Sequence, residues 1–266
     1  MRPLGAGARL VDGLEVIARL ARSNVLDVYD ASDSRRGCRV AVKTLRPDRR
    51  RDPRARRALL REGRLLARLA HPHLVRAYEV HDGERPFAVL EGLRGATLGA
   101  LIEQRRLTPL ETAHLGTQVG SALRYLHGEG LVHLDVKPSN VIADGQAAKL
   151  FDLSLARRPG RVKPGTGTWS NLAPEQARDE LAGPPADVWG LGAILYEAIA
   201  GEPPFGDEAD YPCLERRADP VRRRRPRAPR GLADAINAAL EPAPADRPQL
   251  DALLDAGRPA GRGRWR

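Results

Sequence analysis

Residues 133–140 of the chain read HLDVKPSN. This stretch contains a carboxylate, Asp135, a lysine two residues later, Lys137, and an amide three residues beyond that, Asn140. Phosphoryl transfer needs a carboxylate to receive a hydroxyl proton, a cation for the migrating group and oxygen ligands for a metal ion. The stretch therefore predicts a phosphoryl-transfer loop, although any one of these residues alone could simply make turn hydrogen bonds.

Length and composition point to a folded chain. Its 266 residues, 42% of them hydrophobic, suffice for one large core or for two lobes. The sequence has no apolar run of about 18 residues, and its N-terminus lacks the apolar core of a signal peptide. Cys38 and Cys213 are too far apart in sequence to suggest a disulfide framework. We expect a soluble, cytoplasmic protein with no membrane span.

The net charge of +10 raises the question of a nucleic-acid partner. Only four of the 44 basic residues are lysines, which indicates a compositional bias towards arginine rather than a designed patch. Aromatic residues make up 4% of the chain, too few for a base-stacking platform, so nucleic-acid binding is disfavoured. The basic segment 222–230 is better suited to an acidic partner. Because lysine is so rare in this chain, we expect each lysine, and Lys43 and Lys137 in particular, to have a specific role.

The first part of the chain predicts a small antiparallel sheet and one helix. Apolar segments at 14–20, 25–31 and 39–45 are separated by polar turns and predict a three-stranded meander. Asp52-Pro53 predicts the start of a helix that carries Glu62. Two further strands are expected at 74–80 and 86–90, and residues 91–95 read as a hinge.

The remainder of the chain predicts mainly helices. Thr108-Pro109-Leu110-Glu111 fits a capping box that opens a helix ending near Gly128. Another helix is expected at 186–200 and a final pair at 231–240 and 249–256. The proline-flanked arginines within 221–230 predict a solvated loop rather than a regular helix, and residues 257–266 predict a basic, disordered tail. The fold class is therefore α+β.

Several short motifs now stand in order along the chain: Val40-Ala41-Val42-Lys43, HLDVKPSN, Asp152-Leu153-Ser154, Ala173-Pro174-Glu175 and Asp187-Val188-Trp189-Gly190. Their order and spacing resemble the eukaryotic-type serine/threonine protein kinase family, which in bacteria is called Hanks-type. The resemblance implies a bilobal kinase domain over residues 13–256, with a small lobe at 13–91 and a large lobe at 92–256. It also implies ATP and Mg²⁺ as cofactors and a protein substrate.

The resemblance assigns roles residue by residue. Asp135 would receive the substrate hydroxyl proton, and Lys137 would neutralise the migrating phosphoryl group. Lys43 would pair with Glu62 and contact the nucleotide phosphates. Asn140 and Asp152 would supply oxygens to Mg²⁺. The remaining nucleotide-binding positions are Ala21, Arg22, Ser23, Val28, Ala41, Leu90, Glu91, Leu93 and Ile142.

Three departures from the family pattern are present. Ala21, Ser23 and Leu26 replace the glycines of the phosphate-covering loop, and Arg22, which could compensate with charge, is expected to be solvated. Asp152-Leu153-Ser154 replaces the family's Asp-Phe-Gly. Leu134 replaces the arginine that would clamp a phosphorylated activation loop, so activity should not depend strongly on phosphorylation of Thr166 or Thr168.

Two functions from different classes remain open. An active serine/threonine kinase is favoured because every charged group with a direct catalytic role is retained. The alternative is a pseudokinase that binds a nucleotide or a partner without transferring phosphate, and the altered glycine loop and Leu153-Ser154 motivate it.

Overall fold

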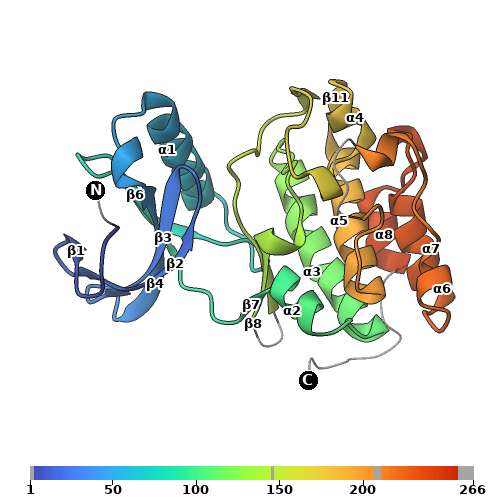
Figure 1. Cartoon of the computed structure of the whole chain (residues 1–266), viewed down its shortest axis with the longest axis horizontal. Coiled ribbons are helices and arrows are strands. Elements are labelled where there is room, and N and C mark those ends of the chain that lie inside the picture. Colours follow the sequence, from blue (N-terminus) through green and yellow to red (C-terminus); the bar gives the residue numbers. More distant parts are fainter. Residues whose placement is uncertain (1–2, 145–146, 207–210, 257–266) are drawn as a thin grey trace. The chain divides into compact units, whose positions relative to one another are not determined.

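The structure is a computed structural model and describes residues 3–144, 147–206 and 211–256. The chain forms two compact units (Figure 1). Unit 1 comprises Met1–Arg94 with Asp152–Ser154, and unit 2 comprises Gly95–Phe151 with Leu155–Arg266. The predicted disordered tail, 257–266, lies outside the described residues.

Unit 1 is built on a six-stranded antiparallel sheet with the order β1-β2-β3-β4-β6-β5. Its elements are β1 (Arg9–Val11), β2 (Leu14–Arg22), β3 (Leu26–Asp33), β4 (Cys38–Leu45), η1 (Pro47–Arg49), α1 (Pro53–Arg68), β5 (Ala77–His81) and β6 (Phe87–Glu91). The predicted meander corresponds to β2, β3 and β4. Strand β5 begins later than the predicted residue 74, because Leu74 is in a turn in which its N–H donates to the carbonyl of His71.

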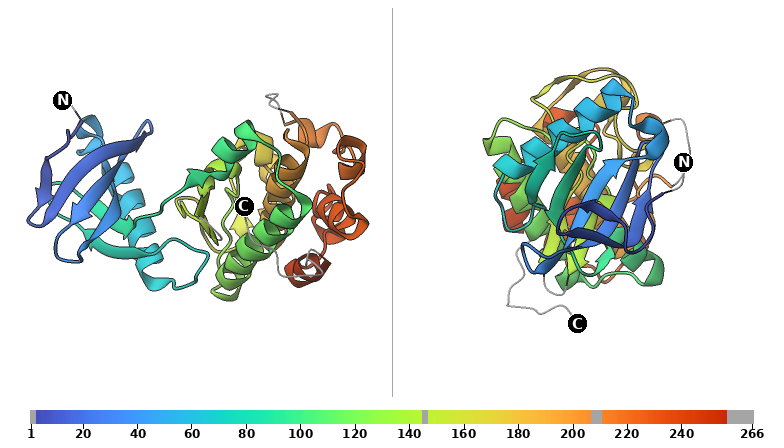
Figure 2. Two further views of the ribbon diagram at one scale, coloured as in Figure 1. Left: turned by 90° about the horizontal axis from the view of Figure 1, so that it is seen from below. Right: turned by 90° about the vertical axis from the view of Figure 1, so that its left-hand side faces the viewer.

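Side chains alternate between the two faces of the sheet along each strand. One face carries a buried apolar cluster of Leu14, Ala31, Val40, Val42, Phe87 and Val89. Helix α1 packs against β4, β5 and β6, and Figure 2 together with Figure 1 shows it lying along the sheet. The helix begins as predicted: the Asp52 carboxylate accepts hydrogen bonds from the N–H groups of Arg54 and Ala55, and Pro53 occupies the first turn.

Unit 2 is mainly helical. Its longer elements are α2 (Leu98–Gln104), α3 (Pro109–Gly128), α5 (Pro184–Ala200), α7 (Arg230–Ala239) and α8 (Leu250–Ala256). Its short elements are β7 (Ala96–Thr97), η2 (Pro138–Asn140), β8 (Val141–Asp144), β9 (Ala147–Leu150), β10 (Gly160–Arg161), η3 (Trp169–Asn171), α4 (Pro174–Ala177), β11 (Leu181–Ala182), η4 (Pro212–Leu214), α6 (Val221–Arg224) and η5 (Pro244–Asp246). Within the described ranges no helix combines the length and apolarity needed to cross a bilayer.

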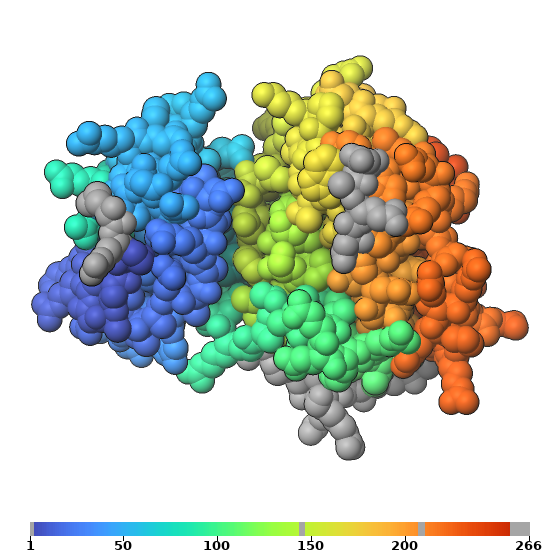
Figure 3. All heavy atoms as spheres, in the orientation of Figure 1, coloured from blue at the N-terminus to red at the C-terminus, as the bar shows by residue number. Residues whose placement is uncertain are grey.

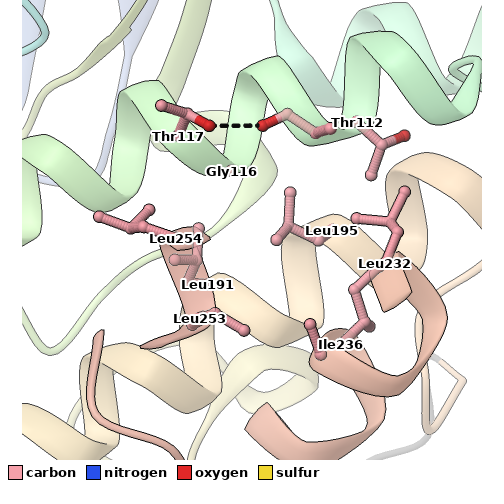
Figure 4. A pocket seen from close by; sticks show the side chains of 11 residues that line it. Thr112, Gly116, Thr117, Leu191, Leu195, Leu232, Ile236, Leu253 and Leu254 are labelled. Carbon is pink, nitrogen blue, oxygen red and sulfur yellow. Dashed lines mark hydrogen bonds between the residues drawn. The ribbon is translucent and has the colours of Figure 1, made fainter. Parts of the chain in front are cut away.

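Helices α3, α5, α7 and α8 pack around a seam of leucines and isoleucine. Figure 4 shows Leu191 and Leu195 of α5 and Leu254 of α8 on the side of the seam that faces α3. A Cβ atom on Gly120 of α3 would lie 2.3 Å from the Cδ2 of Leu254, so this glycine permits the close approach of α8. The remaining space, about 10 Å³, does not hold a ligand, and the hollow is a packing seam.

The prediction of a loop at 221–230 is wrong for its first residues, because Val221–Arg224 forms the short helix α6. Val221 is fully buried, and its N–H donates to Oδ1 of Asn237. Arg223 and Arg224 both pair with Asp219 at 2.8 and 3.0 Å. These anchors, which lie outside the arginine run itself, hold a helical turn that local sequence disfavours.

The capping box predicted at the start of α3 is confirmed. The Thr108 hydroxyl accepts from the N–H of Glu111 at 3.2 Å, and Oε2 of Glu111 accepts from the N–H of Thr108 at 2.8 Å. Arg105 binds the same carboxylate in bidentate fashion at 2.7 and 2.9 Å. Burial alone would raise the pKa of Glu111. The hydrogen bonds from Arg105, together with those from Thr108, outweigh this effect and lower the pKa to about 2.

A buried ion pair braces the C-terminal part of unit 2. Nη1 and Nη2 of Arg247 donate to the two oxygens of Glu175 at 2.7 and 2.8 Å, and both side chains are almost fully buried. Arg247 also donates to the carbonyls of Pro185, Glu241 and Pro242, and its guanidinium lies 4.9 Å from the ring centre of Trp189. The pair therefore ties α4 to the start of α5 and to the segment that precedes α8.

We predict that Glu111→Gln lowers the free energy of unfolding at pH 7 by about 2 kcal/mol. Because the folded-state pKa lies below the ordinary value of 4.5, the ionised carboxylate contributes its stability above that pH and loses it as the pH falls towards 2. The difference between variant and wild type should therefore shrink at about pH 3. Urea unfolding at the two pH values measures it. Glu103→Gln, at an exposed position of α2, is the control, and an equal loss there would contradict the prediction.

We predict that Arg247→Met destabilises the protein by about 3–5 kcal/mol, because Glu175 is left as a buried, unpaired charge. The double variant E175Q/R247M should recover part of the loss, since it leaves no buried charge. Arg124→Met is the matched control: its pair with Asp251 at 3.1 Å is exposed and should contribute about 0–1 kcal/mol. A loss for R247M no larger than that for R124M, measured by urea unfolding, would rule out the bracing role.

Candidate active site

Unit 1 contains a buried lysine–glutamate pair. Lys43 of β4 places Nζ 2.8 Å from both carboxylate oxygens of Glu62, which projects from α1. Burial alone would lower the pKa of Lys43, but the carboxylates of Glu62 and Asp152 outweigh it and raise the pKa above its ordinary value. The lysine therefore stays a cation where few charges are tolerated, which suits an anionic ligand.

Asp152, the predicted metal ligand, lies beside this pair in unit 1. Its Oδ1 is 3.4 Å from Nζ of Lys43 and accepts a hydrogen bond from the N–H of Ser154 at 3.2 Å. Asp152 has a positive φ of 65°, an uncommon conformation for a residue with a side chain. The next residue, Leu153, is fully buried and takes the place of the family's phenylalanine.

Arg61 holds this segment through a contact that the sequence did not reveal. Its Nη2 donates to the carbonyl oxygen of Ser154 at 2.5 Å, so one turn of α1 presents Glu62 to Lys43 and Arg61 to the backbone next to Asp152. A bond to a backbone carbonyl does not depend on the identity of the bonded residue, and no sequence motif reports it.

The hairpin between β2 and β3 closes without glycine. The Ser23 hydroxyl accepts hydrogen bonds from the N–H groups of Val25 and Leu26 at 3.2 and 2.9 Å, so the side chain stabilises the turn. Arg22 is not merely solvated as expected, since its Nε lies 3.0 Å from the buried carboxylate of Asp27. Neither residue is thus free to wrap around phosphates without breaking a local contact.

Strand register brings five of the predicted nucleotide-binding residues to one face of the sheet. Val28 is opposite both Ala21 and Lys43, and Ala41 is opposite Leu90. Directly opposed residues, and residues two apart on a strand, point to the same side. Glu91 is opposite Val40 and belongs to the other face. Leu93 follows the end of β6, and Ile142 is on β8 of unit 2, opposite Thr97 and Lys149.

Unit 2 brings together the carboxylate, the lysine and a hydroxyl. Oδ1 of Asp135 accepts from the Thr168 hydroxyl at 2.8 Å, and Oδ2 lies 2.8 Å from Nζ of Lys137. Lys137 also donates to the Thr168 oxygen at 2.7 Å. A hydroxyl thus already makes with Asp135 the bond that a general base makes with a substrate hydroxyl.

Asn140 is oriented with its amide oxygen available. Its Nδ2 donates to the carbonyl of Asp135 at 2.9 Å and to Oδ2 of Asp135 at 3.0 Å. This fixes the amide so that Oδ1 is the group left to act as a ligand, as Mg²⁺ coordination requires. In the portions of the chain that the structure describes, no three His, Cys, Asp or Glu side chains form a metal cluster. An ion held by Asn140 or Asp152 would need phosphate oxygens and water to complete its shell, which is how Mg²⁺ is ordinarily bound beside nucleotides.

The backbone of residues 133–140, which we call the catalytic loop after its predicted role, is held by one buried carboxylate. Asp187 of α5 accepts from the N–H groups of His133 and Leu134 and contacts Nε2 of His127, each at 2.8 Å. Leu134 has a positive φ of 65° and is buried. Asp187 therefore stabilises an unfavourable backbone conformation immediately before Asp135.

Gln176 makes a second set of contacts that the sequence did not predict. Its buried amide donates to the carbonyls of Leu134 and Thr166 at 3.0 and 2.9 Å and accepts from the N–H of Ala173 at 3.2 Å. A Cβ on Gly167, where φ is +125°, would lie 3.0 Å from the Leu134 carbonyl oxygen. The glycine allows the segment that carries Thr168 to press against the catalytic loop, and Gln176 links the two.

Comparisons with known proteins agree with this geometry. Residues 16–256 match the protein kinase domain family model. A probable serine/threonine-protein kinase of Streptomyces coelicolor is 36% identical over 201 residues, covering 70% of this chain and 30% of the relative. Serine/threonine-protein kinase PknB of Mycolicibacterium smegmatis is 35% identical over 228 residues, covering 80% and 36%. The chain thus spans about a third of the length of these relatives.

A solved structure extends the likeness to the fold. The crystal structure of the Mycobacterium tuberculosis PknI kinase domain is 26% identical, with a TM-score of 0.75, and the match covers 96% of this chain and 98% of that one. The sheet with one helix in unit 1 and the helical unit 2 agree with the predicted bilobal kinase fold. The chain belongs to the protein kinase family, among the bacterial serine/threonine kinases of the Hanks type.

Proposed function

We propose that the chain is an active serine/threonine protein kinase that transfers the γ-phosphoryl group of ATP to a protein hydroxyl. The main support is the pair of contacts at Asp135. One oxygen of its carboxylate accepts a hydrogen bond from the Thr168 hydroxyl, and the other contacts the Lys137 ammonium. A base and a cation that meet at one hydroxyl are what in-line phosphoryl transfer requires.

The proposed step keeps the proton and the charge in balance. Asp135 takes the proton as the substrate oxygen bonds to the γ-phosphorus, while the bond from that phosphorus to the bridging oxygen breaks and ADP leaves with the electron pair on that oxygen. Lys137 stabilises the charge on the transferred group. ATP, bound with Mg²⁺, supplies the phosphoryl group, and Asn140 and Asp152 are the proposed metal ligands.

Lys43 and the sheet face around it are the proposed nucleotide contacts. Lys43 keeps its charge because of Glu62 and Asp152 and is suited to pair with phosphate oxygens. Ala21, Val28, Ala41 and Leu90 share its face of the sheet and offer an apolar surface to a base. Arg22, Ser23, Glu91, Leu93 and Ile142 remain proposals that the register does not bring to this face.

A second candidate, nucleotide binding without transfer, is favoured by the hairpin that Ser23 closes. Glycine-rich loops cover phosphates with free backbone N–H groups, whereas here the N–H of Leu26 is bound to Ser23. This candidate keeps the roles of Lys43 and Asp152 and removes only turnover.

We further propose that turnover does not require phosphorylation of Thr166 or Thr168. Leu134 offers no cation for a phosphate, and Gln176 links the catalytic loop to the Thr166 backbone with neutral hydrogen bonds. The Thr168 hydroxyl is engaged by Asp135 and Lys137, and adding a phosphate there would break both contacts.

We predict that Asp135→Asn abolishes phosphate transfer, by about 10²–10⁴-fold, because an amide cannot receive the proton. Radiolabelled ATP with the protein alone and with a generic acceptor measures transfer, and ATP-induced thermal stabilisation with Mg²⁺ measures binding. Binding should survive the substitution, since Asp135 is not a proposed nucleotide contact. Equal labelling by the wild type and by the Asp135→Asn variant would indicate a contaminating kinase. If the wild type binds ATP but transfers no label, the nucleotide-binding candidate is supported instead.

We predict that Thr166→Ala retains turnover within about twofold, whereas Gln176→Leu lowers kcat about tenfold or more. The leucine fills similar space but leaves the two carbonyls and one N–H unpaired, which loosens the catalytic loop. The KM for ATP should change little in both variants, because Gln176 contacts none of the proposed nucleotide residues. Loss of most of the turnover in T166A, or unchanged kcat in Q176L with an intact fold by circular dichroism, would contradict the neutral link.

A further inference from the structure

The outer face of α1 carries an array of arginines unlike any other helix face of the described chain. Their spacing is three, four, three and four residues, and all five side chains are exposed. We call this set the arginine stripe: Arg54, Arg57, Arg61, Arg64 and Arg68. Figure 3 shows side chains projecting into solvent from the light-blue segment that contains α1.

Helical geometry makes the stripe continuous. At about 100° per residue the five positions fall within about 80° of the helix surface, and at about 1.5 Å per residue they extend over about 20 Å. The opposite face holds Leu59 and Leu66, which are buried against the sheet. The stripe therefore points away from the core along nearly the whole helix.

Few of these charges are neutralised within the protein. Arg64 reaches Asp82 at 3.3 Å, but Asp82 also binds Arg56 at 2.5 Å. Arg54, Arg57 and Arg68 make no ion pair in the parts of the chain that the structure covers. The single carboxylate of α1, Glu62, is buried with Lys43 and faces the other way.

The array costs the helix stability. Apart from the N-cap Asp52, the first turn of α1 offers arginines and no acidic residue, and cations at the positive end of a helix are unfavourable. Like charges three and four residues apart also repel. Composition does not account for the array, because α3, with 20 residues, has one arginine, Arg124, whereas α1 has six in 16. An external anion would offset what the helix loses.

We propose that the arginine stripe is a docking surface for an acidic segment of a partner protein. Guanidinium groups bind carboxylates in bidentate pairs, and a row of about 20 Å matches an acidic segment of several turns or an extended one of about six residues. The surface does not depend on phosphoryl transfer, so it would stand even if the chain only binds nucleotide.

Other anions fit the stripe less well. Its face has no aromatic residue on which a base could stack, which disfavours single-stranded nucleic acid. A membrane-surface helix needs an apolar face to insert, and the apolar face of α1 is already buried against the sheet. The basic segment 222–230 also competes poorly, since Arg223 and Arg224 are paired with Asp219.

Docking on this face would act on a helix that already serves the candidate active site. Glu62 projects from the same helix to Lys43, and Arg61 of the stripe binds the Ser154 carbonyl. A partner that binds the stripe would therefore contact the helix that positions both Glu62 and Arg61.

The test compares the wild type with R54Q/R57Q/R68Q, which keeps helix propensity and avoids Arg61 and Arg64 because both make internal contacts. The matched control, R222Q/R227Q/R230Q, removes the same charge from exposed positions of unit 2. The probes are a fluorescent peptide of about 20 residues rich in Glu, its Gln counterpart, a dT oligonucleotide, and phosphatidylserine–phosphatidylcholine vesicles. Binding is measured by anisotropy, or by sedimentation for vesicles, at about 150 mM salt, where diffuse attraction is screened.

We expect the Glu peptide to bind the wild type, the stripe variant to bind it about tenfold more weakly and the control variant to stay within about twofold. The Gln peptide should not bind. Equal weakening in the two variants would show that binding follows net charge alone and would overturn the proposal. No binding of the Glu peptide, or tighter and stripe-dependent binding of DNA or vesicles, would overturn it as well.

Discussion

The catalytic loop depends on the buried carboxylate of Asp187. A buried carboxylate in that position is stable only because it accepts two backbone hydrogen bonds and contacts His127. In return it holds Leu134 in a left-handed conformation that a leucine does not adopt readily. The direction in which Asp135 points follows from this turn, and so do the positions of the lysine and amide that bind its oxygens. Removing the acceptor would release the geometry on which the proposed chemistry depends.

Neutral hydrogen bonds are present at two of the chain's departures from the family pattern. Where the family has an arginine before the catalytic aspartate, this chain has Leu134, and its carbonyl is bound by Gln176. Where the family has glycines in the phosphate-covering loop, Ser23 closes the hairpin with its hydroxyl. Neither the amide of Gln176 nor the hydroxyl of Ser23 carries a charge. This is the basis of the proposal that turnover does not require phosphorylation of Thr166 or Thr168.

Sequence reasoning predicted the elements whose signals are local. The cap at Asp52, the capping box at Thr108 and the meander each depend on residues a few positions apart, and all three are present. It failed at Val221–Arg224, where a buried valine and a distant asparagine decide the conformation. Within the candidate site, the charged residues could be named because phosphoryl transfer demands those side chains. Arg61 and Gln176 could not, since each binds backbone carbonyls, and their roles exist only once the fold brings those carbonyls close.

The division of labour between lysine and arginine follows from their shapes. Lys43 is buried and must place a compact ammonium 2.8 Å from both oxygens of Glu62 while lying within 3.4 Å of Asp152. A planar guanidinium would satisfy one carboxylate through its fork but would not present the same charge to the second. Lys137 similarly serves one carboxylate and one hydroxyl from different directions. Arginine, by contrast, is found where one carboxylate is bound by two parallel hydrogen bonds, as Arg247 binds Glu175 and Arg105 binds Glu111. In a chain where arginine supplies almost every positive charge, these two lysines therefore mark positions at which several groups must share one cation.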